Sequence, residues 1–129
     1  KLCDFVTPNE IEAEQITGIP VKSVSDAEVA ADKLIEKGAS AAVITLGEQG
    51  ALFKDSKQII HQPSFQVGPI VETTGAGDAF NGGLAVALAE EMPIDKALRF
   101  ACATASISVT RPGTAPSMPD RNEIDALLI

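Results

Sequence analysis

Apolar and polar residues alternate along the chain in blocks that predict strands separated by helices. The run from Ala41 to Leu46 is short, continuous and rich in β-branched residues, which is typical of a buried parallel strand. It follows a segment from Ser25 to Gly38 whose apolar residues recur at helical spacing. A strand that is reached through a helix indicates a βαβ crossover, so the pattern predicts one domain of the α/β class.

Later segments predict an antiparallel edge and two further helices. Turn residues at 47–50 and 54–57 separate short apolar runs, which favours antiparallel hairpins at the edge of the sheet. A helix is expected over 79–90, deeply buried because it is apolar nearly all round. Another helix is expected from 94 to about 110.

The first helix has sequence signals at both ends. Thr7 is expected as its N-cap and Glu10 as the third residue of a capping box, and Gly18 supplies the stop. Asn9 and Glu12 are three residues apart, so both are expected on one face, where they could meet a ligand or the water shell of a metal. The same pair also fits a solvated acidic first turn that complements the helix dipole.

Composition argues against several classes of function. The 129 residues carry 10 Lys and Arg against 18 Asp and Glu, a net charge of −8 without a basic cluster, which disfavours nucleic acid and acidic membranes as partners. The longest apolar helical run, Leu84 to Ala89, is far shorter than the roughly 20 residues that span a bilayer, so a soluble protein is expected.

The cysteines and the histidine narrow the possible chemistry. Cys3 and Cys102 lack CxxC spacing and are expected to be buried, reduced thiols. His61 is the only histidine, which excludes a His-based metal site or a Ser-His-Asp triad within this chain. We expect it on the surface of a strand.

The stretch from Glu72 to Gly83 carries the strongest chemical indication. An apolar run meets a helix there through Gly75 and Gly77, which leave successive backbone N–H groups able to face an anion. Asp78 follows at the start of the helix, either as a cap alone or as a base that accepts a proton from an attacking hydroxyl. Neither the P-loop nor the dinucleotide-binding fingerprint is present, so the stretch suggests phosphoryl transfer to a hydroxyl.

This stretch resembles a known family signature. Residues 74–82, Thr-Gly-Ala-Gly-Asp-Ala-Phe-Asn-Gly, resemble the C-terminal signature of the ribokinase-like carbohydrate kinases, also called the phosphofructokinase B type. Segments 7–14, 45–50 and 111–117 resemble the family's N-x-x-E segment, nucleotide loop and monovalent-cation loop, in family order. The resemblance covers essentially the whole chain. It implies a three-layer αβα sandwich with a mostly parallel sheet, an antiparallel hairpin edge, and helices on both faces.

The resemblance also implies a role for particular residues. Asp78 would be the catalytic base, and Gly75, Ala76 and Gly77 would form an anion hole. Glu12 would hold Mg²⁺ through water. The residues implied in ATP binding are Asn9, Thr45, Gly47, Glu48, Gln49, Gly50, Gly77 and Cys102, the last of them lining the adenine pocket. The residues implied around a potassium ion are Glu72, Thr74, Ser108, Arg111, Gly113 and Ser117.

The implied reaction is the ATP-dependent phosphorylation of the primary hydroxyl of a sugar, with D-ribose giving ribose 5-phosphate as the expected case. The alternatives are another sugar or nucleoside kinase of the family, such as a fructokinase, deoxyribokinase or adenosine kinase, or a non-catalytic nucleotide-binding module. Residues 1–129 would be the C-terminal, ATP-binding and catalytic part of the kinase domain, without its sugar-binding half and lid, and inactive alone.

Three further expectations accompany this resemblance. The ligands would be ATP, Mg²⁺, a monovalent cation and a small sugar. The full-length protein is expected to be a cytoplasmic homodimer without nucleic-acid or membrane partners. Glu72 stands where the family usually has Asp, and it keeps the charge on a side chain that is one methylene longer.

Overall fold

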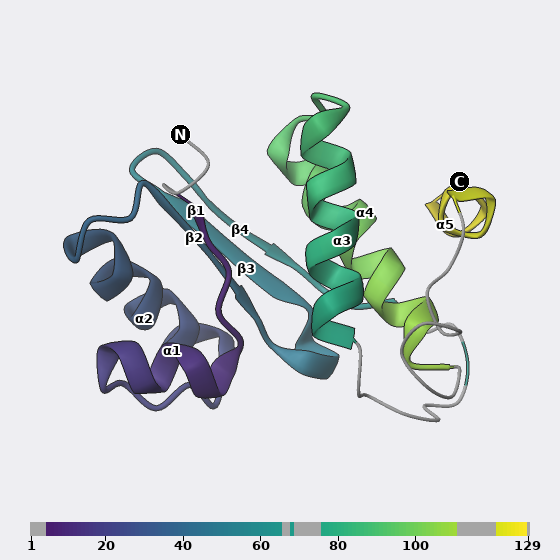
Figure 1. Ribbon diagram of the computed structural model, residues 1–129. Helices are drawn as coiled ribbons and strands as arrows, with labels where there is room; N and C mark the ends of the chain where they lie inside the picture. The colour runs from purple at the N-terminus through teal and green to yellow at the C-terminus, as the bar shows by residue number, and fades with distance from the viewer. Residues whose placement is uncertain (1–4, 66–67, 69–75, 111–120, 129) are drawn as a thin grey trace. The chain divides into compact units, whose positions relative to one another are not determined.

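The computed structural model describes residues 5–65, 68, 76–110 and 121–128 (Figure 1). The chain divides into two compact units, Lys1–Pro63 and Ser64–Ile129. In the described part of the chain, no helix combines the length and the apolar character needed to cross a membrane.

The first unit is a four-stranded sheet with two helices. The strand order is β1-β2-β3-β4, with β1 and β2 parallel and the other two pairings antiparallel. Its elements are β1 (Phe5–Val6), α1 (Glu10–Thr17), α2 (Val24–Glu36), β2 (Ala41–Thr45), the 3-10 helix η2 (Gly47–Gln49), β3 (Ala51–Asp55) and β4 (Ile59–Gln62). The predicted crossover and hairpin edge are both confirmed. The turns beside β3 are too short for parallel crossovers, so antiparallel pairings outnumber the parallel one among the described strands.

Helices α1 and α2 cover one face of this sheet, as Figure 1 shows. Their small residues, among them Ala13, Ala27 and Ala30, pack with Ile44 and Leu52 in one buried cluster. Small side chains allow the helices to lie close to the strands, which keeps the ends of β2 and α1 near one another.

The pairing register extends this face to the edge strand. Ile44 pairs with Leu52, and Leu52 pairs with His61 of β4. Because paired residues on neighbouring strands point to the same side, His61 belongs to the face that the helices cover. It lies on the edge strand and is exposed, as predicted for a strand-surface residue.

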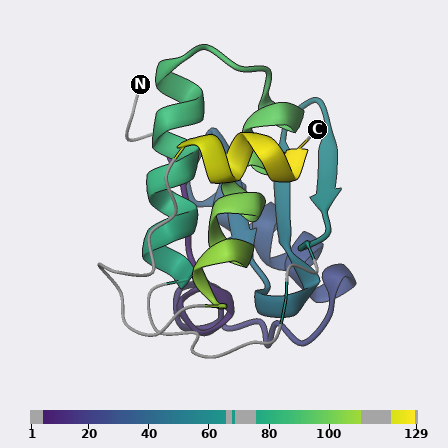
Figure 2. The same cartoon turned by 90° about the vertical axis from the view of Figure 1, so that its right-hand side faces the viewer.

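The second unit contains the helices α3 (Ala76–Ala89), α4 (Ile94–Ser108) and α5 (Arg121–Leu128). α3 and α4 pack so closely that a Cβ placed on Gly83 would lie 2.7 Å from Oγ1 of Thr104. α5 lies across α4 (Figure 2), where Arg121 stacks over Phe100 and pairs with Glu90.

The predicted deep burial of the helix at 79–90 is only partly correct. α3 buries one face, which includes Ala79, Phe80 and Leu84. Val86 and Leu88, however, are 44% and 40% exposed. An all-round apolar sequence indicates that a helix can be buried on every side, whereas the described residues bury one face of α3.

Candidate functional site

The start of α1 is attached to the end of β2 by backbone pairing. The N–H group of Thr45 donates to the carbonyl of Pro8 at 3.1 Å, and Asn9 and Thr45 form a parallel bridge. The backbone is therefore still extended at Asn9, and the helix begins one residue later, at Glu10. Two residues that the sequence assigned to nucleotide contact, Asn9 and Thr45, become direct neighbours.

A capping box fixes Asn9 and Glu12. Oδ1 of Asn9 accepts from the N–H of Glu12 at 2.8 Å, and Oε1 of Glu12 accepts from the N–H of Asn9 at 3.0 Å. The predicted box on Thr7 and Glu10 was therefore wrong by two residues, because the strand pairing extends past Thr7. Both side chains lie at the N-terminal end of one helix, as predicted, and each accepts a capping hydrogen bond from a backbone N–H group there.

The η2 loop forms a compact turn beside this helix start. Its backbone bonds run from Gln49 N to Leu46 O at 3.0 Å, and from Gly50 N to Gly47 O at 3.1 Å. Gly47 and Gly50 have φ values of +57° and +92°, where glycine is favoured. A Cβ placed on Gly47 would lie 3.9 Å from Oε1 of Glu10, so the loop reaches the first residue of α1.

Strand β4 supports the back of the loop. A Cβ on Gly50 would collide with the carbonyl oxygen of Gln62 and lie 2.8 Å from Cα of Pro63. Nε2 of His61 lies 2.7 Å from the carbonyl oxygen of Gln49. The sequence placed His61 on a strand but missed this contact, which depends on the register of the hairpin.

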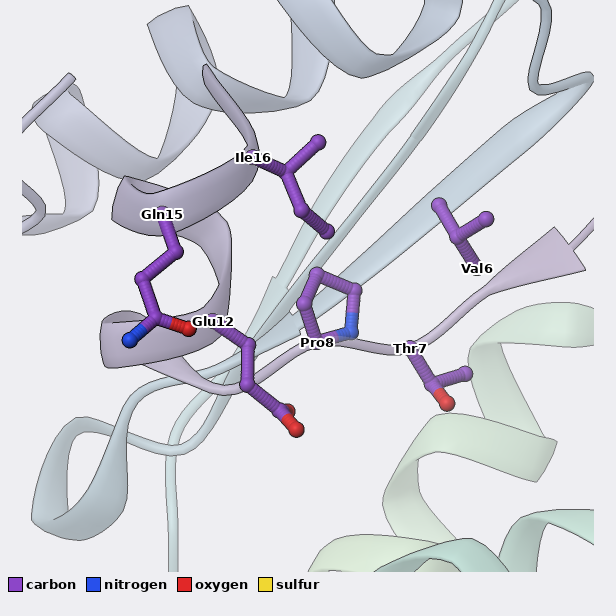
Figure 3. A pocket seen from close by; sticks show the side chains of 6 residues that line it. All are labelled: Val6, Thr7, Pro8, Glu12, Gln15 and Ile16. Carbon is purple, nitrogen blue, oxygen red and sulfur yellow. The ribbon is translucent and has the colours of Figure 1, made fainter. Parts of the chain in front are cut away.

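A shallow depression of about 460 Å³ lies next to Glu12 (Figure 3). Its apolar wall comes from Val6, Pro8 and Ile16, and its polar rim includes Thr7 and Glu12. Figure 3 shows the carboxyl group of Glu12 and the hydroxyl of Thr7 pointing toward the same side, away from Ile16. The carboxylate of Glu12 is therefore accessible as well as fixed.

The first turn of α3 holds the proposed base. Gly77 and Asp78 are both exposed, and Asp78 is the third residue of the helix. Within the described part of the chain, a Cβ placed on Gly77 would have no neighbour within 4 Å. The positive end of the helix dipole and a carboxylate thus lie beside open space.

Two predicted residues lie in α4. Cys102 is 3% exposed, and burial raises the pKa of its thiol to about 12, so it is a neutral apolar contact and no nucleophile. The predicted buried, reduced thiol is confirmed for Cys102. Ser108 is the last residue of α4, so its carbonyl oxygen lies at the negative end of the helix dipole, which suits a cation.

The structure brings only some of the predicted residues together. Asn9, Glu12, Thr45 and the loop 47–50, with exposed Glu48, lie in the first unit. The second unit contains Ala76, Gly77, Asp78, Cys102 and Ser108. The predicted residues Cys3, Glu72, Thr74, Gly75, Arg111, Gly113 and Ser117 lie outside the described residues. Among the described residues, no group of three or more His, Cys, Asp and Glu could hold a metal ion.

Comparison with known proteins assigns the family. The profile of the pfkB family carbohydrate kinases matches residues 1–121. The chain is 44% identical to the ribokinase of Haemophilus influenzae over 95% of this chain and 40% of that protein. It is 39% identical to the deoxyribokinase of Salmonella typhi over 98% of this chain and 41% of that protein. The chain thus spans about 40% of the length of the curated relatives it matches.

Solved structures give the same result for the fold. The ribokinase of Arabidopsis thaliana, complexed with ribose and ATP, has a TM-score of 0.92 and 36% identity over 97% of this chain and 40% of that chain. Phosphofructokinase-2 of Escherichia coli, in complex with potassium, has a TM-score of 0.82 and 28% identity over 95% of this chain and 39% of that chain. The chain therefore has the ribokinase-like α/β fold and belongs to the pfkB family of carbohydrate kinases.

Proposed function

We propose that the protein catalyses the ATP-dependent phosphorylation of the primary hydroxyl of a sugar, with D-ribose as the first candidate. The observation that supports this is the first turn of α3, in a member of a carbohydrate kinase family. An exposed carboxylate, Asp78, follows directly after a glycine whose added Cβ would meet none of the described residues. That arrangement suits a hydroxyl and an anionic group held side by side.

In the proposed reaction, Asp78 accepts the proton of the sugar hydroxyl. The hydroxyl oxygen forms a bond to the γ-phosphorus of ATP, and the bond from that phosphorus to the β–γ bridging oxygen breaks, which releases ADP. Backbone N–H groups of Gly75, Ala76 and Gly77 donate to the transferring group, whose charge is greatest in the transition state. The N-terminal end of α3 adds its partial positive charge.

The nucleotide contacts in this proposal begin with residues that lie close together in the structure. Asn9, Thr45 and the loop 47–50 bind ATP, and they are supported by their proximity in the structure. Gly77 contacts the phosphates, and Cys102 lines the adenine pocket with a neutral thiol. The ATP complex of the Arabidopsis thaliana ribokinase supports the choice of nucleotide.

Two cations belong to the proposed site. Mg²⁺ is usually held by one or two carboxylates together with substrate phosphates, and the fixed, accessible Glu12 suits one water-mediated contact of that kind. When bound, Mg²⁺ would offset the charge of the phosphates. A monovalent cation would be held by Ser108 at the end of α4, together with Glu72, Thr74, Arg111, Gly113 and Ser117.

Residues 1–129 supply the ATP-binding and catalytic part of the kinase in this proposal. The identity of the sugar acceptor is a separate question for experiment. One relative is a ribokinase and another a deoxyribokinase, so a pentose is favoured over a nucleoside. Assays of the expressed native protein with ribose, 2-deoxyribose, fructose and adenosine would separate these acceptors. ADP release with another acceptor but none with ribose would contradict the ribose assignment. The expected homodimer and the expected lack of nucleic-acid and membrane partners stay predictions.

Substitution of Asp78 tests the reaction itself. Asp78→Asn should keep nucleotide affinity while kcat falls by about 10²- to 10⁴-fold, because the base is lost and the shape is kept. Asp95→Asn is the matched control, since Asp95 is also an exposed carboxylate in the first turn of a helix, α4. Full activity of Asp78→Asn would remove Asp78 from the mechanism.

A further inference from the structure

The ring of His61 joins the edge strand β4 to the η2 loop. Nε2 of His61 lies 2.7 Å from the carbonyl oxygen of Gln49, twelve residues earlier in the chain. A carbonyl oxygen can only accept, so Nε2 carries the proton and donates it. This contact is made by a side chain that is otherwise exposed and has no role in the proposed chemistry.

The bond fixes the peptide group between Gln49 and Gly50. The carbonyl of that group accepts from His61, and its N–H donates to the carbonyl of Gly47 at 3.1 Å. Gly50 itself lies against the backbone of Gln62 with no room for a side chain. Both polar groups of the peptide are therefore held, which sets the orientation of the loop that faces α1.

We propose that His61 is a positioning residue for nucleotide binding, acting through the Gln49 carbonyl on the loop 47–50. The inference rests on the proposed function, in which that loop contacts ATP. His61 need not touch the nucleotide. It holds the loop in the binding conformation before ATP arrives, which lowers the ordering cost of binding.

The expected effect falls on affinity and leaves the chemical step unchanged. A loop that contacts ATP equally in the ground state and the transition state alters KM without altering kcat. Loss of one neutral hydrogen bond predicts a rise of roughly 3- to 10-fold in KM for ATP. The free energy of unfolding should change little, since the bond is at the surface of an edge strand.

Three variants of the native protein test the inference. His61→Met removes the donor and keeps the length of the side chain, whereas His61→Gln keeps an N–H donor. Ile59→Met is the matched control, because Ile59 lies two residues away on the same face of β4 and is also exposed, at 46%. We expect KM for ATP to rise in His61→Met, to return to within about twofold of wild type in His61→Gln, and to be unchanged in Ile59→Met.

Two readouts separate positioning from a general structural role. Urea unfolding should give equal midpoints for the two His61 variants. The imidazole ¹⁵N signals of the wild type, which are assigned by their loss in His61→Gln, should show a ring protonated at Nε2. These signals should shift on addition of ATP. An unchanged KM in His61→Met, or an equal rise in both His61 variants, would overturn the inference. If the wild-type protein neither binds ATP nor transfers phosphate, the proposed function fails instead.

Discussion

Two segments that we assign to ATP binding, the η2 loop and the first turn of α3, both contain glycine, but for different reasons. In the loop, Gly50 has a φ of +92° and lies against the backbone of β4. In α3, Gly77 has helical neighbours, and no described residue lies within 4 Å of the position of a Cβ. Glycine in a helix costs up to about 1 kcal/mol relative to alanine, and packing among the described residues gives no reason for Gly77.

The difference decides what a substitution can report. A side chain at Gly50 disturbs the fold and the proposed site together, so lost activity there says little about chemistry. A side chain at Gly77 leaves the described packing intact and enters only the space that we assign to the transferring phosphoryl group.

Gly50→Ala should have the largest effect. Its Cβ would collide with the carbonyl oxygen of Gln62, and its backbone would be held in a conformation that side chains rarely adopt. We expect the free energy of unfolding, measured with urea, to fall by about 2–4 kcal/mol. Gly18→Ala is the control, because Gly18 has a φ of +76° but open surroundings, and should cost about 1 kcal/mol. Equal losses in the two variants would show that β4 does not constrain the loop.

Gly83→Ala should come next, by a packing mechanism. Its Cβ would lie 2.7 Å from Oγ1 of Thr104 and 3.2 Å from Cα of Ala101, so α3 and α4 would have to separate slightly. A loss of about 1–3 kcal/mol is expected from thermal or urea unfolding, with kcat of the folded enzyme retained. Adding Thr104→Ala should recover part of the loss. Strict additivity in the double variant would contradict the proposed contact.

Local sequence signals predicted the elements whose causes are local. The buried strand β2 follows from its β-branched run, and Gly18 ends α1 because its backbone is left-handed, with a φ of +76°. α4 begins at Ile94, directly after Pro93, as the sequence indicated. In each case the residues that decide the structure lie within one helical turn of one another.

The features that the sequence did not predict depend on distant pairing. The N-cap of α1 is Asn9 and not Thr7, because Thr45 pairs with Pro8 and keeps the chain extended. The contact of His61 with Gln49 likewise requires the hairpin register. No local pattern contains this information, since the partner strand must be positioned first.

For the candidate site, too, the sequence and the structure supply different information. Its residues were predicted through resemblance to the family, and the structure pairs Asn9 with Thr45 and brings Gly47 near the side chain of Glu10. The roles of Asp78, Gly77 and Glu12 in catalysis and cation binding stay predictions, because they concern ligands. The structure adds one fact that the resemblance could not supply. Packing among the described residues does not require a glycine at position 77.

Glu90→Gln, just beyond the end of α3, should have a small, pH-dependent effect. Hydrogen bonding to Arg121 lowers the pKa of Glu90 below its usual range. A carboxyl group whose pKa is lowered by folding stabilises the folded state at pH values above its pKa in the unfolded chain, about 4.3. This stabilisation is lost as the pH falls through its pKa in the folded state. The wild type should therefore have the higher Tm at pH 7, and the difference should close in acid.

The control for this change is Glu91→Gln, which removes the same charge at the next residue, also exposed. Neither variant should alter kcat, because both lie at the opposite end of α3 from Asp78. A Tm difference that persisted at low pH would contradict the assigned ion pair. A change in kcat would show that this end of α3 influences the first turn, and would weaken the comparison.

Gly77→Ala should have the smallest effect on folding and a clear one on activity. Alanine should leave the free energy of unfolding unchanged or raise it by up to about 1 kcal/mol, since nothing described lies within 4 Å of its Cβ. The same methyl group would occupy space assigned to the transferring phosphoryl group, so kcat should fall by about tenfold or more. Urea unfolding and steady-state kinetics on one preparation measure both quantities. Gly83→Ala, the same change in the same helix, should show the reverse pattern. A Gly77→Ala enzyme with full kcat would mean that this glycine serves neither packing nor phosphoryl transfer, and the anion hole would then have to be sought outside the first turn of α3.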